Sequence, residues 1–228
     1  MAVRSDQKRR TDSAQAKRDA ERYDDIKSRT GERSRRVSAA GRDIGPPPAI
    51  VDPARRESCR LDFRLFCETY LPESFPLAWS PDHLRAIAKI EAAVLRGELF
   101  AFAMPRGSGK TTLCTAACLW AIVFGHRQFI VLVGSDQSIA EQMLDSIKSH
   151  LEQNNLLADD FPHTVYPVRA LEGINARARG QTSEGVPTKI EWTADQITFA
   201  ALPGSPSSGA AVRVAGITGR IRGLTHTR

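Results

Sequence analysis

The sequence has no long hydrophobic run, although 41% of its 228 residues are hydrophobic. No apolar stretch approaches the ~18–20 residues that cross a bilayer, which excludes an integral membrane protein. The first residues, MAVRSDQKRRTDSAQ, are basic but have no apolar core, which excludes a secretory signal. Four cysteines are too few for a disulfide scaffold in a chain of this length. We therefore expect a soluble, intracellular protein with reduced thiols.

Leucine and phenylalanine are absent from residues 1–56, where Ile26 stands alone in a charged stretch. Burial of so little apolar surface does not offset the entropy cost of ordering a backbone. Residues 1–60 contain 16 basic and 10 acidic residues, so the net charge of +6 belongs to this quarter. We predict a disordered or helical basic arm over 1–56 and a folded domain over 57–228. The arm is either a solvated tail or a contact for DNA or a partner.

The folded domain shows a regular succession of helix and strand patterns. We expect an apolar-rich helix from Cys59 to near Pro72, and another with Ser80 as N-cap that Gly97 ends. A capping box at Ser138-x-x-Glu141 predicts a further helix, striped by Ile139, Met143, Ile147 and Leu151. The expected strands are 99–104, 129–133, 188–192, 196–200 and 211–215, with a buried helix over 111–123. Strand and helix alternate from 99 to 151, which predicts a parallel sheet with right-handed crossovers.

The strongest motif is Arg106-Gly107-Ser108-Gly109-Lys110-Thr111, between an expected strand and an expected helix. The two glycines permit close approach of backbone N–H groups to a phosphate chain, and a helix N-terminus favours the anion. Lys110 would reach the terminal phosphates and the Thr111 hydroxyl would bind Mg²⁺. The motif therefore predicts a Walker A loop that binds a nucleoside triphosphate.

The loop departs from the full pattern in two respects. Met104 stands six positions before Lys110, where the pattern has glycine. Arg106 lies inside the loop, where it either pairs with the γ-phosphate or caps the loop as a surface charge. A glycine turn with an incidental lysine is the competing interpretation of the whole segment.

Together with three other segments, this loop resembles the N-terminal ATPase region of phage terminase large subunits, which package DNA into capsids. The four segments are Trp79-Ser80-Pro81-Asp82-His83, Pro105–Thr112, Val131-Leu132-Val133-Gly134-Ser135-Asp136 and Gly216-Ile217-Thr218-Gly219-Arg220-Ile221-Arg222-Gly223. The resemblance covers roughly residues 57–228. It implies an α/β P-loop NTPase fold of the RecA-like kind, with a partial parallel sheet flanked by helices.

The resemblance also implies ligands, partners and site residues. ATP and Mg²⁺ would be the cofactors, with Lys110 and Arg106 catalytic and Thr111 on the metal. Trp79 or His83 would lie at the adenine, and His83, in the first turn of its helix, is the better candidate for a polar contact. Double-stranded DNA, a terminase small subunit and a portal would be partners of an oligomeric motor in the bacterial cytoplasm. The residues expected to contact the nucleotide are Pro105, Arg106, Gly107, Ser108, Gly109, Lys110, Thr111, Thr112 and His83.

No segment has the acidic strand that such an ATPase needs, four apolar residues ending in Asp and followed by Glu. Asp136 comes three residues after its apolar run, and the run 197–200 leads to Ala201. We therefore expect a domain that is incomplete at its C-terminus, cut before the acidic strand and the nuclease domain. Two alternatives stay open: a non-catalytic truncated product that binds DNA or a partner, and a fragment of a helicase-like P-loop ATPase.

The sequence contains no acidic residue after Asp195, but it contains Arg213, Arg220, Arg222 and Arg228. These arginines either contact DNA or ATP phosphates or form an unpaired surface patch. The cysteines have no CxxC spacing and no nearby histidine, so we predict free, buried thiols instead of a zinc site.

We predict that this chain alone hydrolyses ATP very slowly or not at all, because the catalytic carboxylates are missing. A turnover assay on the purified chain checks this, with the Lys110→Ala variant as background. A rate well above that of the variant contradicts the prediction.

Overall fold

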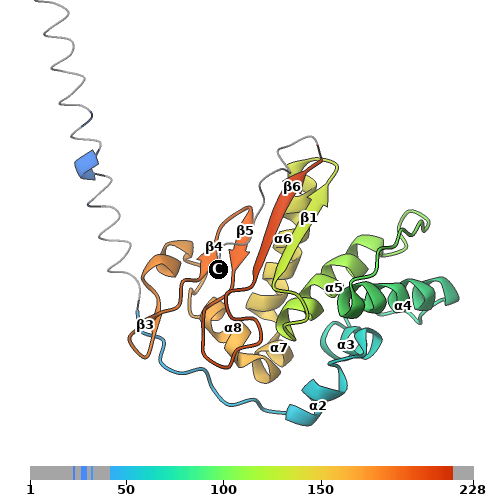
Figure 1. Cartoon of the computed structure of the whole chain (residues 1–228), viewed down its shortest axis with the longest axis horizontal. Helices are drawn as coiled ribbons and strands as arrows, with labels where there is room; N and C mark the ends of the chain where they lie inside the picture. The colour runs from blue at the N-terminus through green and yellow to red at the C-terminus, as the bar shows by residue number, and fades with distance from the viewer. Residues whose placement is uncertain (1–22, 24–26, 30–31, 33–41, 218–228) are drawn as a thin grey trace, which may run out of the picture.

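The computed structural model describes residues 23, 27–29, 32 and 42–217. Most of the expected arm lies outside the described residues, as do Arg220, Arg222 and Arg228. The described body has a mixed α/β architecture, with a four-stranded main sheet, a separate two-stranded sheet of β2 and β3, and helices packed against the main sheet (Figure 1). Within the described chain, no helix is long and apolar enough to cross a membrane.

The helices precede, connect and flank the strands. The helices are α2 (Pro53–Ser58), α3 (Phe63–Tyr70), α4 (Pro81–Arg96), α5 (Lys110–Val123), α6 (Gln137–Gln153), α7 (Asn155–Asp160), α8 (Pro162–Arg169) and a 3-10 helix (Asn175–Gly180). The strands are β1 (Phe129–Gly134), β2 (Thr182–Ser183), β3 (Val186–Pro187), β4 (Glu191–Trp192), β5 (Gln196–Thr198) and β6 (Ala211–Gly216).

The main sheet has the strand order β1-β6-β5-β4 and is mixed. Only β1 and β6 are parallel, in register from Phe129 opposite Ala211 to Gly134 opposite Gly216. Strands β5 and β4 continue the sheet in antiparallel fashion. The short turn between β4 and β5 permits only antiparallel pairing, whereas β1 and β6 are joined through α6, α7 and α8. The parallel sheet predicted from the alternation over 99–151 does not form, because 99–104 is not a strand; the parallel pair in the described chain joins β1 to β6 instead.

The predicted strand 99–104 does not form. The segment leaves α4 as irregular chain, and Leu99 is 100% exposed. Its backbone is locally extended, because Phe100 and Phe102 stack with centroids 5.5 Å apart, as residues i and i+2 do on one side of a strand. Strand formation also needs a neighbour for the backbone N–H and C=O groups, and among the described residues this segment has none. The apolar pattern was therefore insufficient evidence for a strand.

Helix boundaries follow local capping chemistry. The prediction for α4 is confirmed: Ser80 accepts a hydrogen bond from the His83 N–H, and Gly97 ends the helix at φ 79°. The helix expected from Cys59 is wrong at its start, because Asp62 caps a separate helix, α3, that begins at Phe63. Side-chain capping of the first N–H groups decides where each of these helices begins.

The predicted capping box of α6 is also wrong. The N-cap is Asp136, whose Oδ1 accepts from the Ile139 N–H at 3.0 Å and from the Ser138 hydroxyl at 2.7 Å. These hydrogen bonds hold the pKa of Asp136 below its usual value. The buried face consists of Ala140, Leu144, Ile147 and Leu151, while Ile139 is 40% exposed. The predicted stripe was thus displaced by one residue over the first two turns.

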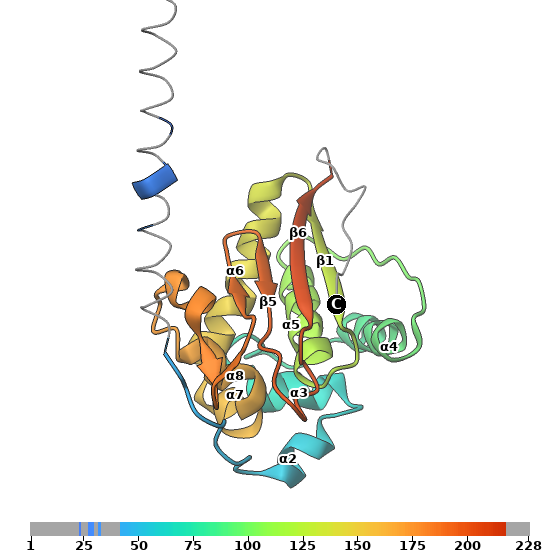
Figure 2. The same ribbon diagram turned by 60° about the vertical axis from the view of Figure 1, so that its left-hand side comes forward.

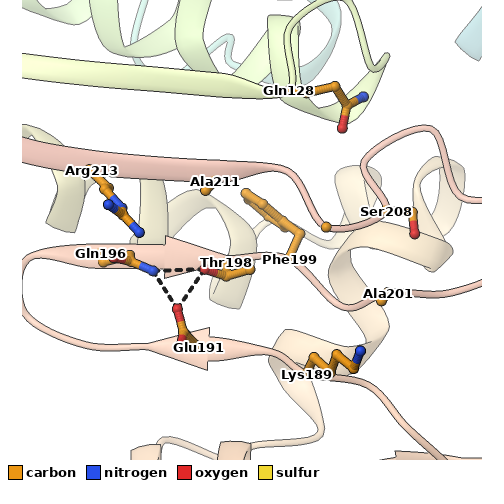
Figure 3. A pocket seen from close by; sticks show the side chains of 11 residues that line it. Gln128, Lys189, Glu191, Gln196, Thr198, Phe199, Ala201, Ser208, Ala211 and Arg213 are labelled. Atoms are coloured by element: carbon orange, nitrogen blue, oxygen red, sulfur yellow. Dashed lines mark hydrogen bonds between the residues drawn. The ribbon is translucent and has the colours of Figure 1, made fainter. Parts of the chain in front are cut away.

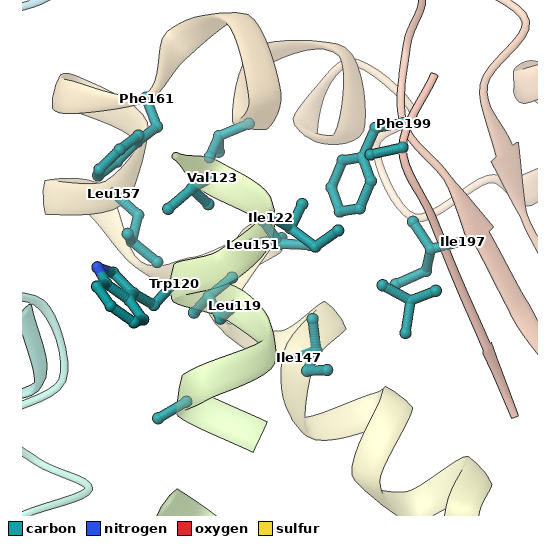
Figure 4. Packing of buried hydrophobic residues seen from close by; sticks show 14 of the residues in the cluster. Leu119, Trp120, Ile122, Val123, Ile147, Leu151, Leu157, Phe161, Ile197 and Phe199 are labelled. Atoms are coloured by element: carbon teal, nitrogen blue, oxygen red, sulfur yellow. The ribbon is translucent and has the colours of Figure 1, made fainter. Parts of the chain in front are cut away.

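The core lies between the sheet and the helices on one of its faces. Helix α6 packs against β1 and β6, and α5 packs against α6 (Figures 1 and 2). In Figure 4, Leu119, Ile122 and Val123 of α5 meet Ile147 and Leu151 of α6, with Ile197 and Phe199 beside them. No helix in the described part of the chain covers the opposite face, on which Arg213 and Thr198 lie.

The packed body begins upstream of Glu57. The Ile44 N–H donates to the Thr182 carbonyl at 2.8 Å, and the Tyr166 hydroxyl donates to the Ile44 carbonyl at 2.7 Å. Ile44 itself is buried. Residues 42–56, which the sequence assigned to the arm and linker, therefore contact the domain.

One buried carboxylate joins three helices. Asp160 of α7 is fully buried, and its Oδ2 accepts from Arg55 Nε and from the Tyr70 hydroxyl, each at 2.7 Å. Arg55 Nη2 donates to Oδ1 at 2.9 Å, which makes the ion pair bidentate. The bond to Asp160 raises the pKa of Arg55, and burial raises that of Tyr70. The arrangement fixes α2 and α3 against α7.

We predict that Asp160→Asn destabilises the fold by about 2–3 kcal/mol, because it leaves the Arg55 charge without its partner at a partly buried position. The urea midpoint of unfolding measures the effect. Asp145→Asn is the matched control, since Asp145 is exposed and pairs only with Lys148 on its own helix; we expect a change within about 0.5 kcal/mol. Equal midpoints for the two variants contradict this assignment.

Candidate functional site

The glycine loop 105–109 leads directly into α5. Gly107 and Gly109 have φ values of 80° and 75°, in the left-handed region that favours glycine. Gly109 is the N-cap of α5, and no side chain caps this helix. The first N–H groups of a 14-residue helix therefore lack a side-chain acceptor at the positive end of the helix dipole. Such an N-terminus favours an anion.

Lys110 turns back over the loop. Its Nζ donates to the carbonyl oxygens of Met104 and Pro105, at 2.7 Å in both cases. Met104 occupies the position where the full motif has glycine, and it contributes only a backbone oxygen to the ammonium group. The ammonium is thus held beside the loop backbone by two acceptors that carry no net charge.

The other predicted phosphate contacts lie around the start of α5. Arg106 and Thr111 are exposed, and neither side chain has a hydrogen bond or ion pair with the described residues. Thr112 is half-buried. The structure therefore brings Arg106, Lys110 and Thr111 to one helix end with no carboxylate bound to them.

His83 links α4 to the loop. Its Nδ1 lies 2.8 Å from the Ser80 hydroxyl, and its Nε2 lies 2.9 Å from the Ser108 carbonyl. Both ring nitrogens are thus engaged by protein atoms, so a polar contact from His83 to a base would replace one of these bonds. His83 also closes the capping box of α4, so one side chain orders both the helix start and the loop.

A cavity of about 200 Å³ adjoins the loop. Phe75, Trp79, Leu113 and the glycine loop are among its walls. The Trp79 ring packs against Phe75 at a centroid distance of 5.0 Å, and its Nε1 donates to Glu68 at 2.7 Å. The Trp79 ring packs against the core and also forms a wall of the cavity. Phe75 was missed, although the apolar run Phe75-Pro76-Leu77-Ala78-Trp79 was its signal.

Ser108 supports a ligand at this loop. Its Oγ is buried and has no hydrogen-bond partner. A buried hydroxyl without a partner costs stability that an acceptor atom of a ligand would restore. Among the described residues, no group of three or more His, Cys, Asp and Glu side chains is arranged to bind a metal ion. A Mg²⁺ ion would therefore depend on Thr111 and on oxygens of the nucleotide.

Compared with known proteins, the chain matches no family model, and no solved structure matches it significantly. The terminase resemblance therefore rests on the four sequence segments alone.

The remaining predicted features lie elsewhere. Arg213 lies on β6, on the open face of the sheet. All four cysteines are free, as predicted, and burial raises the pKa of each thiol. Cys59 and Cys67 are fully buried, whereas Cys114 and Cys118 are half-buried on α5.

We predict that His83→Ala loosens the loop while leaving the fold intact. The substitution removes the bond to the Ser108 carbonyl and half of the capping box, at a cost of about 1 kcal/mol. Hydrogen exchange of residues 105–110 should quicken, and thermal unfolding measures the stability loss. Arg85→Ala, at an exposed position on the same helix, is the control. Unchanged exchange in His83→Ala would show that the ring does not order the loop.

Proposed function

We propose that this chain is the ATP-binding motor-domain part of a viral DNA-packaging terminase large subunit. The observation that carries the proposal is the uncapped N-terminus of α5, which follows a loop of two left-handed glycines and begins with Lys110. An aromatic cavity adjoins the same loop. A triphosphate with a planar base needs both features side by side.

The phosphate part of the proposal assigns a role to each loop residue. The backbone N–H groups after Gly107 and Gly109 would bind the phosphate oxygens, and Lys110 would exchange its two carbonyl acceptors for the terminal phosphates. Arg106 would contact the γ-phosphate, and Thr111 would bind Mg²⁺. An anion is the stronger acceptor for the Lys110 ammonium, because charge-assisted bonds exceed those to neutral carbonyls.

The base part of the proposal rests on the cavity wall. A planar base would lie against Trp79 and Phe75, at the mouth formed by Gly107–Gly109. Because the ring nitrogens of His83 are engaged by Ser80 and Ser108, we assign His83 to positioning the loop.

The packing of the four terminase-like segments supports the family assignment. The Trp79–His83 segment contacts the glycine loop through the His83–Ser108 bond. Of the fourth segment only Gly216 and Ile217 lie within the described residues, and Gly216 meets the third segment where β1 and β6 end: a Cβ on Gly216 would lie 2.8 Å from the Gln137 N–H nitrogen, so the close approach needs glycine. In this proposal the complete protein couples ATP hydrolysis to translocation of double-stranded DNA, with a small subunit and a portal as partners in the host cytoplasm.

A second candidate is a non-catalytic product that binds DNA or a partner. It is favoured by the failure of residues 99–104 to join the sheet, because a motor needs a rigid strand ahead of its phosphate loop. A helicase-like ATPase has no observation of its own in its favour.

Binding of a fluorescent ATP analogue tests the proposal. We expect Lys110→Ala to weaken binding by about tenfold or more, the equivalent of one charge-assisted hydrogen bond. Lys89→Ala on the exposed face of α4 is the matched control and should bind as the unmodified chain does. Thermal unfolding confirms that both variants fold. Equal affinity of the unmodified chain and Lys110→Ala would refute the nucleotide site.

A further inference from the structure

The open face of the sheet contains a second cavity that the nucleotide site does not use. It lies over β4, β5 and β6 and has a volume of about 570 Å³. Its polar lining includes Lys189, Gln196, Thr198, Ser208 and Arg213, and Figure 3 shows these side chains around it. Cations and hydrogen-bond donors therefore line this part of the sheet.

Arg213 is the first cation of this cavity. It lies opposite Gln196 in the β5–β6 register, and its neighbours Val212 and Val214 are buried on the other face. Its Nε is buried without a hydrogen-bond partner, and no ion pair forms between its guanidinium and the described residues. The guanidinium lies 5.9 Å from the centroid of the Phe129 ring. By contrast, Arg55, Arg64 and Arg96 each pair with a carboxylate.

Lys189 is the second cation, and its backbone is strained. Its φ is 54°, a conformation that costs a side-chain-bearing residue about 1–2 kcal/mol. Thr188 and Ile190 on either side are buried, whereas the Lys189 side chain is exposed and lines the cavity on the open face of the sheet. It forms no hydrogen bond or ion pair with the described residues. Strain that the surrounding structure maintains is typical of functional positions.

Glu191 lies between the two cations without pairing with either. Its Oε2 accepts from the Gln196 amide and, at 2.8 Å, from the Thr198 hydroxyl. Figure 3 shows Arg213 and Lys189 at opposite ends of the cavity, with this hydrogen-bonded group between them. An anion at one end would therefore not contact the cation at the other.

We propose that this cavity binds a ligand with at least two phosphate groups, one at Arg213 and one at Lys189. The guanidinium matches a phosphate in bidentate fashion, and the lysine supplies a point charge. The Glu191 carboxylate would repel a single anion placed at the centre of the cavity. Two phosphates that are spaced apart would instead lie at the two ends, one at each cation, on either side of Glu191. Polyphosphates and the backbone of a nucleic-acid strand share this chemistry. The site is independent of Lys110 and of the proposed ATP site.

The test uses the full chain carrying Lys110→Ala, which weakens phosphate binding at the glycine loop. Binding of a linear polyphosphate of about ten units is measured by calorimetry at low salt, and binding of a labelled 12-nucleotide single strand by fluorescence anisotropy. In this background we expect Arg213→Gln and Lys189→Gln each to weaken at least one probe by about tenfold. Arg96→Gln removes an exposed, ion-paired arginine and serves as the control, which should change neither affinity.

The pattern of the two probes identifies the source of the phosphates. Weakening confined to the linear polyphosphate indicates a polyphosphate ligand, and weakening confined to the strand indicates a nucleic-acid backbone. For the strand, each lost cation should also reduce the slope of log affinity against log salt by about one. The basic arm is present in every variant, so its contribution cancels.

Thermal unfolding shows whether each variant is folded. Lys189→Gln changes an exposed side chain, so we expect this variant to fold. If Arg213→Gln is unstable, Arg213→Lys replaces it, because lysine keeps the charge but loses the bidentate geometry. If Lys189→Gln binds both probes as tightly as the Arg96→Gln control, the proposal is overturned.

Discussion

Burial of α5 on almost every side is the constraint on which the rest of the structure depends. Trp120 packs toward α3, Ile122 and Val123 pack toward α6, and Leu113 lies behind the glycine loop. A helix that is apolar nearly all round has no solvent-facing side that would let it rotate. The N-terminus of α5 is therefore fixed in position, and it fixes the position of the glycine loop that leads into it.

The two proposed anion sites differ in physical origin. At the glycine loop the positive potential comes mainly from backbone N–H groups and the helix dipole, with Lys110 held nearby by neutral carbonyls. On the open sheet face it comes from Arg213 and Lys189, whose partners are missing among the described residues. Residues 61–228 have a net charge of zero, so the overall charge does not attract an anion. The local placement of the N–H groups, Lys110, Arg213 and Lys189 decides where an anion would bind.

Much of the candidate site was readable from the sequence, because local chemistry produces it. Ser80, Pro81 and Gly97 define α4, and the glycine–lysine segment defines the start of α5. The link between His83 and Ser108 was not readable, because it joins residues 25 positions apart through a packing contact. The cavity was not readable for the same reason, because residues 74–79 form it together with the distant residues 107–109 and Leu113.

The sequence by itself determined α4 with both of its caps, the β1 and β6 strands and the uneven distribution of charge. Periodicity and capping act within a few residues, so they need no knowledge of distant neighbours. The Asp136 cap of α6 is equally local, and the choice of Ser138 in its place was an error of interpretation. Only the tertiary structure decided that 99–104 stays outside the sheet and that residues 42–56 join the body. It alone placed Lys189 and Arg213 in one cavity, because strand pairing brings together residues that lie far apart along the chain.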